Sequence, residues 1–423
     1  MKQSMFNHTA AMSNGGCVIY NFYTGQAMLF NIFSRDYYEH FELYKKDHPM
    51  IQKLVEKGFL VEDDEIEDLK KRVLEDREDA ENVVLTICPT LRCNFACPYC
   101  FETPRSGRMS EEVQENIVSF VKRILELGHT KSLNIMWYGG EPLLEMKIIE
   151  SLSQKLIALC EDMKVKYRAA IITNGYLLTP DKAAIFEKCK IRYAQITLDG
   201  PNAEMNDKTR HLINGSGTYE RILENIRNFK GRTTLKIRCN VHKENADQYP
   251  QLEKLFEDIS KETGQEIMLR AGHMDGHGDY EDKAFSIAEY ADFYKKNKSN
   301  FKLLHYEGPR CTYPKEYDFV IDEQGNLCKC LESVNHDDEI VGNVKDYDSK
   351  DDSSYFAEKM DACRALAWPE GDEECLSCKL LPVCLGGCPR KRRMSEKQCS
   401  GYKFALDEYV LAIGKEMATR GKK

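Results

Sequence analysis

The chain has 423 residues, a net charge of −9 and 30% charged residues. That length is compatible with two or three domains, and the acidic balance argues against a general nucleic-acid-binding surface. No run approaches about eighteen apolar residues, and residues 1–10 lack the apolar core of a secretion signal. We therefore expect a cytoplasmic protein that binds neither nucleic acid nor a membrane.

Seventeen cysteines are hard to explain as disulfides in a reducing compartment, so metal binding is the better explanation. They form two dense groups, one at residues 93–100 and one between residues 311 and 399. The others are scattered, several of them inside apolar runs, where a thiol packs as a small hydrophobic group.

Residues 17–33 predict two strands joined by a Thr-Gly turn. Helical segments follow at residues 34–44 and 48–58, and the acidic stretch 62–78 is a third helix or a linker. Ser34 is the candidate cap of the first of them. A hairpin followed by three helices indicates a winged-helix-like domain at residues 1–80, and the alternative is a simple cap on a catalytic domain.

From residue 83 onward, short β-branched runs alternate with helical patterns. The predicted strands are 83–87, 133–137, 169–172, 194–198, 235–239 and 267–270. The predicted helices are 110–127, 145–163, 180–188, 219–229 and 249–263. Six strand-then-helix units predict a parallel sheet, either curled into a partial barrel or doubly wound. In both folds the chemistry belongs at the carboxyl ends of the strands.

Chemically special residues follow four of these strands. They are the cysteines of 93–100, then the segments 138–142, 173–175 and 199–201. Glycines in these segments let the backbone approach a ligand closely, and the carboxylates of Glu141 and Asp199 could pair with an ammonium group or ribose hydroxyls. Each segment alone is an ordinary turn. Four of them on one rim predict a binding site.

Cys93, Cys97 and Cys100 are spaced three-then-two, which is typical of a cluster held by three ligands. A four-iron cube has four corners, so three thiolates would leave one iron open to activate something else. The alternatives are a zinc knuckle with a distant fourth ligand, or three free thiols. Zinc sites usually pair Cys-x2-Cys with a second pair or with histidines. Neither a His nor a Cys follows Cys100 before His129.

With these motifs, residues 85–215 resemble the radical S-adenosylmethionine (radical SAM) enzymes. The resemblance implies a partial (β/α)6 TIM-like barrel at residues 81–300 and a [4Fe-4S] cluster on Cys93, Cys97 and Cys100, whose open iron chelates SAM. Reductive cleavage of SAM would give a 5′-deoxyadenosyl radical that abstracts hydrogen from a C–H bond. The residues expected to contact SAM or substrate are Tyr99, Gly139, Gly140, Glu141, Pro142, Asn174, Asp199 and Arg210.

The second cysteine group reads Cys-x13-Gly-x4-Cys, a gap, Cys-x2-Cys-x5-Cys-x3-Cys, a gap, and Cys. Taken alone, the cysteine spacing of residues 375–388 fits a zinc ribbon and a single iron–sulfur cluster equally well. The whole string resembles the SPASM extension of radical SAM enzymes, here at residues 301–423, and implies two auxiliary [4Fe-4S] clusters and three in all. The implied ligands are Cys311, Cys330 and Cys388 for the nearer cluster, and Cys375, Cys378, Cys384 and Cys399 for the farther one.

The nearer cluster would have three cysteine ligands, so one iron is left open. The candidates to fill it are Cys328, His305 and a thiol of the substrate. Cys328 is disfavoured, because next-but-one residues on a strand rarely both reach one cluster without strain. We therefore favour a substrate cysteine.

SPASM enzymes commonly modify peptides, and residues 1–80 resemble a recognition element that adds a leader peptide to its sheet. The resemblance implies a radical SAM peptide maturase, an oxidoreductase that forms a Cys sulfur-to-carbon thioether, as in sactipeptides or ranthipeptides. Its partners would be a ribosomal precursor peptide, bound through the N-terminal domain, and a flavodoxin- or ferredoxin-type electron donor.

Three alternatives to a thioether-forming maturase remain. One is carbon–carbon or carbon–oxygen crosslinking of a peptide. Another is a sulfatase-type formylglycine maturase, a branch in which an Asp thought to be the base follows the cysteine equivalent to Cys330. Leu331 replaces that Asp here, and Glu332 is a candidate base in its place. The third is a non-catalytic zinc-dependent peptide-binding scaffold.

Overall fold

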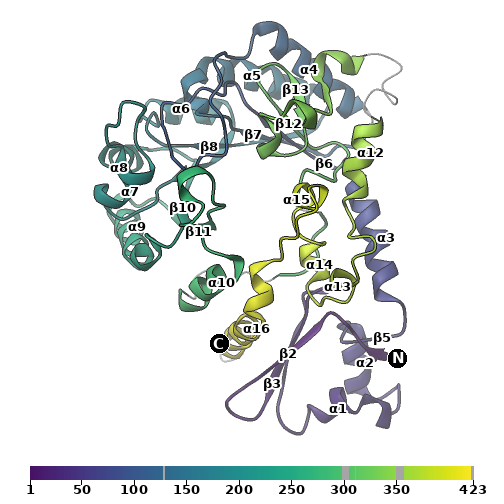
Figure 1. The fold of residues 1–423 in the computed structure, drawn as a ribbon. Coiled ribbons are helices and arrows are strands. Elements are labelled where there is room, and N and C mark those ends of the chain that lie inside the picture. The colour runs from purple at the N-terminus through teal and green to yellow at the C-terminus, as the bar shows by residue number, and fades with distance from the viewer. Residues whose placement is uncertain (127–128, 298–303, 310, 349–356, 421–423) are drawn as a thin grey trace. The chain divides into compact units, whose positions relative to one another are not determined.

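The computed structural model describes residues 1–126, 129–297, 304–309, 311–348 and 357–420 (Figure 1). The chain divides into two compact units. We call residues 79–285 and 315–363 the sheet unit. Residues 1–78, 286–314 and 364–423 are the composite unit, because three separate stretches of chain build it.

A nine-stranded sheet forms the centre of the sheet unit. Its order is β11-β10-β9-β8-β7-β6-β12-β13-β14. Six strands run parallel, namely β6 (Asn82–Ile87), β7 (Ser132–Trp137), β8 (Lys166–Thr173), β9 (Ile191–Thr197), β10 (Thr234–Val241) and β11 (Ile267–His273). Because these six are neighbours in chain order, every crossover advances in the same direction, as in a barrel. A doubly wound sheet would reverse its order partway.

Three short strands extend the sheet beyond β6. They are β12 (Phe319–Ile321), which is parallel to β6, and the antiparallel β13 (Asn326–Cys328) and β14 (Gly342–Asn343). The 3-10 turns η5 (Leu331–Ser333), η6 (Asp337–Glu339) and η7 (Val344–Asp348) lie within this region of the chain. The sheet unit therefore continues past the six expected strands into sequence that follows Cys311.

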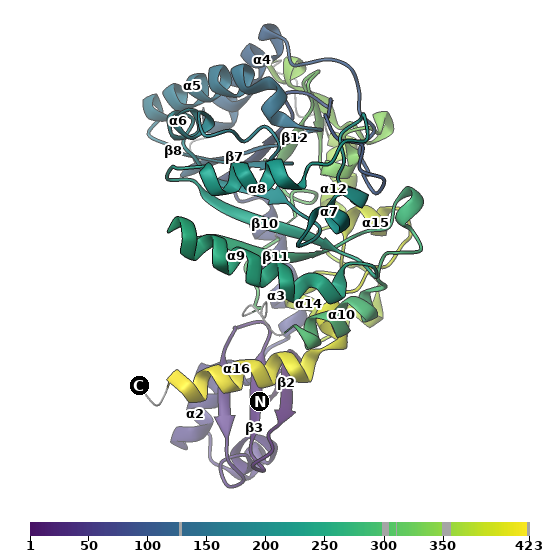
Figure 2. The ribbon, with the colours of Figure 1, turned by 90° about the vertical axis from the view of Figure 1, so that its left-hand side faces the viewer.

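Helices cover one face of the parallel sheet, as Figures 1 and 2 show. They are α4 (Glu111–Glu126), α5 (Met146–Asp162), α6 (Lys182–Lys188), α8 (Tyr219–Asn228) and α9 (Tyr249–Thr263). β10 alternates buried apolar residues with the partly exposed Lys236, Arg238 and Asn240. A parallel sheet covered by helices on both faces would be apolar on both, so the second face of this sheet is the more polar one.

A three-stranded antiparallel sheet organises the composite unit. It consists of β2 (Asn7–Ala11), β3 (Cys17–Asn21) and β4 (Ala27–Phe30), in that order. β3 is buried on both faces. Cys17 and Ile19 pack on the side of α1 (Asp36–Glu39) and α2 (Pro49–Glu56). On the opposite face, Val18 and Tyr20 pack against α16 (Leu406–Arg420).

The composite unit contains further short elements. They are β1 (Lys2–Gln3) paired with β5 (Leu60–Val61), η1 (Phe41–Leu43), α3 (Glu65–Arg77), α10 (Ile287–Lys296), α13 (Glu373–Leu376), α14 (Leu381–Cys384), α15 (Pro389–Arg393) and η8 (Gly401–Phe404). α12 (Ala357–Ala365) runs across the boundary between the units. None of the described helices is both long and apolar enough to span a bilayer.

Three details differ from the sequence expectation. Strand β2 was not predicted, because Asn-His-Thr-Ala-Ala lacks the β-branched alternation of a typical strand. The predicted helix at 34–44 is broken into α1 and η1, and Arg35 rather than Ser34 occupies the cap position. The Ser34 hydroxyl instead accepts a hydrogen bond from the Asn31 N–H at 3.0 Å. The polar helix α7 (Ala203–Thr209) was also missed.

Candidate functional site

Cys93, Cys97 and Cys100 lie on the loop that follows β6. The Cys100 N–H donates to the Cys97 carbonyl at 3.1 Å, and the Phe95 N–H donates to the Cys93 sulfur at 3.4 Å. The loop also pairs with the chain after α7, since the Ala96 N–H donates to the His211 carbonyl at 3.0 Å. Backbone hydrogen bonds therefore hold all three thiols on one short, fixed turn.

Burial dominates the chemistry of these thiols. It raises the pKa of Cys93 to about 12 and that of Cys97 to about 11, while the nearby Arg210 guanidinium acts to lower the Cys97 pKa. Thiolates are the forms that bind metal. Without a compensating cation these side chains are protonated at neutral pH, so binding of iron must release their protons. The donor set fits an iron–sulfur cluster.

The glycines after β7 are required by close backbone approach. Gly139 has φ +119°, and a Cβ there would overlap the Thr90 carbonyl oxygen. A Cβ on Gly140 would overlap the Arg92 carbonyl oxygen. The Gly140 and Glu141 N–H groups donate to these same two carbonyls, at 3.3 and 2.8 Å. The Gly-Gly pair therefore lets the β7 loop lie directly against the start of the cysteine loop.

Glu141 is completely buried and fixes two loops together. Its carboxylate accepts hydrogen bonds from the Leu143 N–H at 2.9 Å, the Thr173 hydroxyl at 2.7 Å and the Asn174 N–H at 2.7 Å. Burial raises the pKa of Glu141, and these donors act to lower it. Most of its acceptor capacity is thus used within the protein. The side chain joins the β7 loop to the end of β8, while Pro142 begins the turn η2 (Pro142–Glu145).

Asn174 extends this connection to the cysteine loop. Its side-chain amide donates to the Asn94 side-chain oxygen at 2.8 Å, and its own oxygen accepts from the Tyr176 N–H at 3.0 Å. Asn94 directly follows Cys93. The loops after β6, β7 and β8 are therefore connected by hydrogen bonds into one rim.

Tyr99, Asp199 and Arg210 form a buried polar network beside the cysteines. The Tyr99 hydroxyl donates to the Asp199 carboxylate and accepts from Arg210 Nη1 at 2.9 Å. The same carboxylate accepts from the Thr209 hydroxyl at 3.1 Å and the Asn240 N–H at 3.0 Å. The sequence placed these three residues near the rim, whereas their mutual contacts and the role of the Tyr99 side chain were not foreseen.

Arg210 has an unused donor in this network. Its Nε is buried and has no hydrogen-bond partner among the described residues. The guanidinium lies 5.4 Å from the centroid of the Phe95 ring. Burial alone would lower the pKa of Arg210, yet Tyr99, Cys97 and Asp199 raise it above its ordinary value. A permanently charged donor without a partner fits the carboxylate of a bound amino-acid group, as in SAM.

Two further groups near the cysteine loop were missed by the sequence. Glu102 is 7% exposed, and burial raises its pKa to about 7 although the Tyr138 hydroxyl bonds to it. Arg105 forms a fork with two buried carboxylates on the turn between β12 and β13. It contacts Asp322 at 3.0 Å and Glu323 at 3.1 Å. These pairs fix the segment that follows Cys100.

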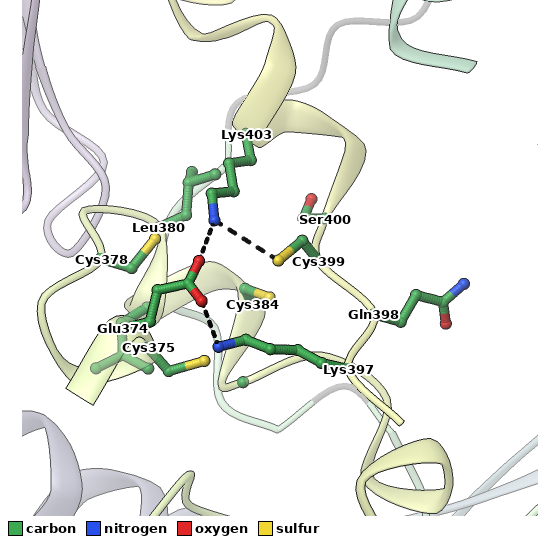
Figure 3. Close-up of a pocket in the computed structure, with 12 residues that line it drawn as sticks. Glu374, Cys375, Cys378, Leu380, Cys384, Lys397, Gln398, Cys399, Ser400 and Lys403 are labelled. Carbon is green, nitrogen blue, oxygen red and sulfur yellow. Dashed lines mark hydrogen bonds and ion pairs between the residues drawn. The ribbon is translucent and has the colours of Figure 1, made fainter. Parts of the chain in front are cut away.

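A second site lies in the composite unit, where Cys375, Cys378, Cys384 and Cys399 line one pocket (Figure 3). The pocket holds about 390 Å³ of empty space, part of it open to solvent. Within the described chain, no three His, Cys, Asp or Glu side chains meet closely enough to hold a single metal ion. Four sulfurs around a pocket, rather than around one point, fit a group larger than one zinc ion.

Local turns bring these four cysteines together. Asp372 caps α13 by accepting the Cys375 N–H at 3.0 Å. Leu385, Gly386 and Gly387 are all left-handed, with φ of +49°, +84° and +85°. A Cβ on Gly387 would overlap the Gln398 carbonyl oxygen. That glycine thus allows the chain before Cys399 to pass beside the turn that follows Cys384.

The other predicted ligands lie in different units. Cys311 and Cys388 belong to the composite unit and Cys330 to the sheet unit. Near the first two, Arg393 of α15 donates to the Tyr313 hydroxyl at 3.3 Å. Cys330 precedes η5, which contains the candidate base Glu332.

The two protein candidates for the open iron of the nearer cluster have other surroundings. Cys328 is fully buried in an apolar cluster with Cys88 and Val320, and its sulfur donates to the Ser333 carbonyl at 3.8 Å. His305 lies against Gly25.

Part of the sheet unit matches a known protein family. Residues 87–256 match the model of the Radical SAM superfamily, so the chain contains a radical SAM domain. The chain is 27% identical to the mycofactocin maturase MftC of Mycolicibacterium smegmatis over 328 residues, which cover 72% of this chain and 78% of MftC. It is 25% identical to the cyclopropyl synthase TigE of Paramaledivibacter caminithermalis, over 42% of this chain and 41% of TigE.

Solved structures share the fold. The structure of anSMEcpe with bound AdoMet and Cp18Cys peptide superposes with a TM-score of 0.59 at 20% identity, covering 81% of this chain and 99% of that one. Streptococcus suis SuiB superposes with a TM-score of 0.52 at 16% identity, covering 95% and 98%. At these identities the likeness concerns the fold alone. It confirms the predicted α/β fold with a partial TIM-like barrel.

Proposed function

We propose that this protein is a radical SAM peptide maturase that joins a cysteine sulfur of a ribosomal precursor peptide to a carbon atom as a thioether. The observation that carries the proposal is the rim of the sheet unit. There, the Gly139-Gly140 turn lies against the start of the loop that carries the three cysteines, and the Arg210 Nε donor has no partner among the described residues. The match to the Radical SAM superfamily and the likeness to a maturase support the radical SAM maturase part of the proposal, to which the thioether is our own addition.

Each part of the rim has a task in this proposal. When bound, SAM on the [4Fe-4S] cluster of Cys93, Cys97 and Cys100 supplies hydrogen abstraction from a peptide C–H bond. Arg210 holds the carboxylate of SAM through its free Nε. Tyr99 and Asp199 hold the guanidinium in place, and Glu141 keeps the loops around the cluster at a fixed separation.

The remaining cysteines form part of the same proposal. Cys375, Cys378, Cys384 and Cys399 hold the farther auxiliary [4Fe-4S] cluster in the pocket of the composite unit. Cys311, Cys330 and Cys388 hold the nearer one and leave an iron for the substrate thiol. The burial of Cys328 among apolar side chains supports its exclusion from this set. Electrons come from a flavodoxin- or ferredoxin-type donor.

An exposed sheet edge supports peptide binding by residues 1–80. The Met12 N–H donates to the Gly16 carbonyl at 2.8 Å and closes the hairpin between β2 and β3. Antiparallel pairs alternate between bonded and non-bonded, so the backbone groups of Thr9 and Ala11 point away from β3. Both residues are exposed. An edge of this kind can accept an added strand.

A groove runs along this edge. It is lined by Asn7, Thr9 and Ala11 on the strand side, and by Arg35, Tyr38 and His40 from α1 and its ends. Its lining is mostly polar, as a hydrogen-bonding peptide backbone requires. SuiB, one of the structures of similar fold, is known with a bound precursor peptide named SuiA. We therefore assign the leader segment of the precursor to this groove.

The groove is tested with proline at each edge of the sheet. Ala11→Pro removes the outward N–H of β2 and should weaken binding of a fluorescent precursor peptide about tenfold or more. Leu29→Pro is the matched control. Leu29 lies in β4, at the opposite edge of the sheet, where its own backbone groups point outward. Equal affinity of the two variants would contradict leader binding at β2.

The crosslink itself is tested by mass. Forming the thioether breaks one C–H and one S–H bond and makes one C–S bond, so the peptide loses two hydrogens. One would leave as a hydrogen atom to the 5′-deoxyadenosyl radical, and the other as a proton to solvent with one electron to an iron–sulfur cluster. Reconstituted, reduced enzyme is incubated with SAM and the precursor encoded beside its gene, and the product is then alkylated. The proposal expects the loss of two hydrogens and one fewer alkylated cysteine. Loss of two hydrogens with every thiol still alkylated would mean a carbon–carbon or carbon–oxygen crosslink instead.

A further inference from the structure

Four charged side chains bridge the two chain segments that line the cysteine pocket of the composite unit. Lys397 contacts Asp372 at 2.9 Å. Figure 3 shows the contacts of Glu374 with Lys397, at 2.9 Å, and with Lys403, at 2.6 Å. Both carboxylates precede Cys375 in the chain, whereas the lysines stand on either side of Cys399. We call Asp372, Glu374, Lys397 and Lys403 the clamp.

The two lysines of the clamp differ in one contact. Lys403 Nζ also donates to the Cys399 sulfur at 3.8 Å (Figure 3). Lys397 makes no hydrogen bond to a sulfur within the described residues, although it lines the same pocket. Their side chains are equally exposed, at 36% each. The pair therefore offers two cations of matched exposure, of which one touches a predicted cluster ligand.

We propose that the clamp joins the two cysteine segments around the farther cluster and that Lys403 raises the reduction potential of that cluster through its contact with Cys399. The inference rests on the proposed function, since it requires a cluster on these cysteines. Hydrogen bonds to ligating sulfurs and nearby positive charge stabilise the more negative, reduced state. Lys403 is thus a positioning and tuning residue, and it need not touch the substrate.

Surface ion pairs alone contribute little to stability. Glu374 is 62% exposed, so its pairs with the lysines are strongly screened by water. If the clamp only stabilises the fold, replacing either lysine should therefore have a small effect of equal size on stability and none on the reduction potential. The hydrogen bond to sulfur predicts that Lys403 has a larger effect on the redox equilibrium than Lys397, which lines the same pocket without a hydrogen bond to a sulfur in the described chain. This difference separates the two readings.

The test compares three variants of the full chain, Lys403→Met, Lys403→Arg and Lys397→Met, each reconstituted anaerobically with iron and sulfide. Redox titration is followed by electron paramagnetic resonance. The signal of the farther cluster is identified as the one that Cys375→Ala lacks. Lys403→Met should disfavour reduction about tenfold, which is a shift of 59 mV to lower potential for one electron. In Lys403→Arg the reduction potential should lie close to that of the wild type, because the positive charge is kept.

Lys397→Met changes the charge by the same amount without removing a sulfur contact. We expect less than a threefold change in its reduction equilibrium, but at least threefold faster loss of iron to a chelator, because the segments are then less firmly joined. A shift in Lys403→Met no larger than in Lys397→Met would overturn the tuning role. Unchanged iron loss in Lys397→Met would overturn the joining role.

A different result would show that the farther cluster, on which this inference rests, does not exist. If wild-type protein carries zinc in this pocket, or about eight irons per chain in place of about twelve, the farther cluster itself is refuted. Parallel assays of iron, sulfide and zinc on the same samples make that distinction.

Discussion

Removing the carboxylate of Glu141 should lower the free energy of unfolding, because that carboxylate accepts three hydrogen bonds that hold the loops of the rim together. In Glu141→Ala the buried Leu143 and Asn174 N–H groups lose their acceptor. The third hydrogen bond to the carboxylate, which the Thr173 hydroxyl donates, is lost as well. Each buried unsatisfied donor costs about 1–3 kcal/mol. The two backbone groups together predict a loss of about 4 kcal/mol in the free energy of unfolding.

Glu141→Gln separates charge from hydrogen bonding. Its amide oxygen can still accept from Leu143 and Thr173, but its NH2 group faces the Asn174 N–H, so one bond is lost. We expect a loss of about 2 kcal/mol. Glu145→Gln, a change of the same kind on the neighbouring turn, is the control, because Glu145 accepts from the half-exposed Arg92 and an amide can do so too.

Urea unfolding and SAM binding are measured on the same reconstituted samples. The structure predicts that stability falls in the order wild type, Glu141→Gln, Glu141→Ala, and that the affinity for SAM falls in the same order. Glu141→Ala with an unchanged free energy of unfolding, together with complete loss of SAM binding by Glu141→Gln, would refute this reasoning. The carboxylate would then serve the ligand rather than the loops.

Two further predictions use matched controls. Arg105→Met leaves two buried carboxylates of the β12–β13 turn without a cation, and should lower the free energy of unfolding in urea by about 3–5 kcal/mol. Lys155→Met, the control, breaks an exposed pair and should lower it by less than about 1 kcal/mol. Equal losses would contradict the role of the fork. Cys97→Ala should remove about four irons and abolish SAM cleavage, while Cys160→Ala, in the buried face of α5, should keep both. Unchanged iron in Cys97→Ala would contradict the ligand assignment.

The sheet was predictable because its parallel strands are short, largely β-branched runs, four of which end at a glycine or cysteine turn. The six expected strands occur at the expected places, and the chemically special residues do lie at their carboxyl ends. The exact contacts were not predictable. Arg210 meets Tyr99 across 111 positions of sequence, and no local pattern reports such a pairing.

The composite unit was harder to predict because its contacts are long-range. Val18 in β3 packs against Val410 in α16, nearly the whole chain away. Strand β2 is polar and lies at an edge, so neither its composition nor its burial is typical of a strand. The helix predicted to start at residue 34 starts only at Asp36, because the Asn31 side chain accepts the Phe33 and Ser34 N–H groups and forms a turn first.

The metal content of the anaerobically reconstituted chain tests the central claim most directly, since every proposed step depends on ten cysteines holding three clusters. Iron, acid-labile sulfide and zinc are counted per chain in one preparation. The account predicts about twelve irons, about as many sulfides and no stoichiometric zinc. About four irons together with one or two zinc ions per chain would contradict it.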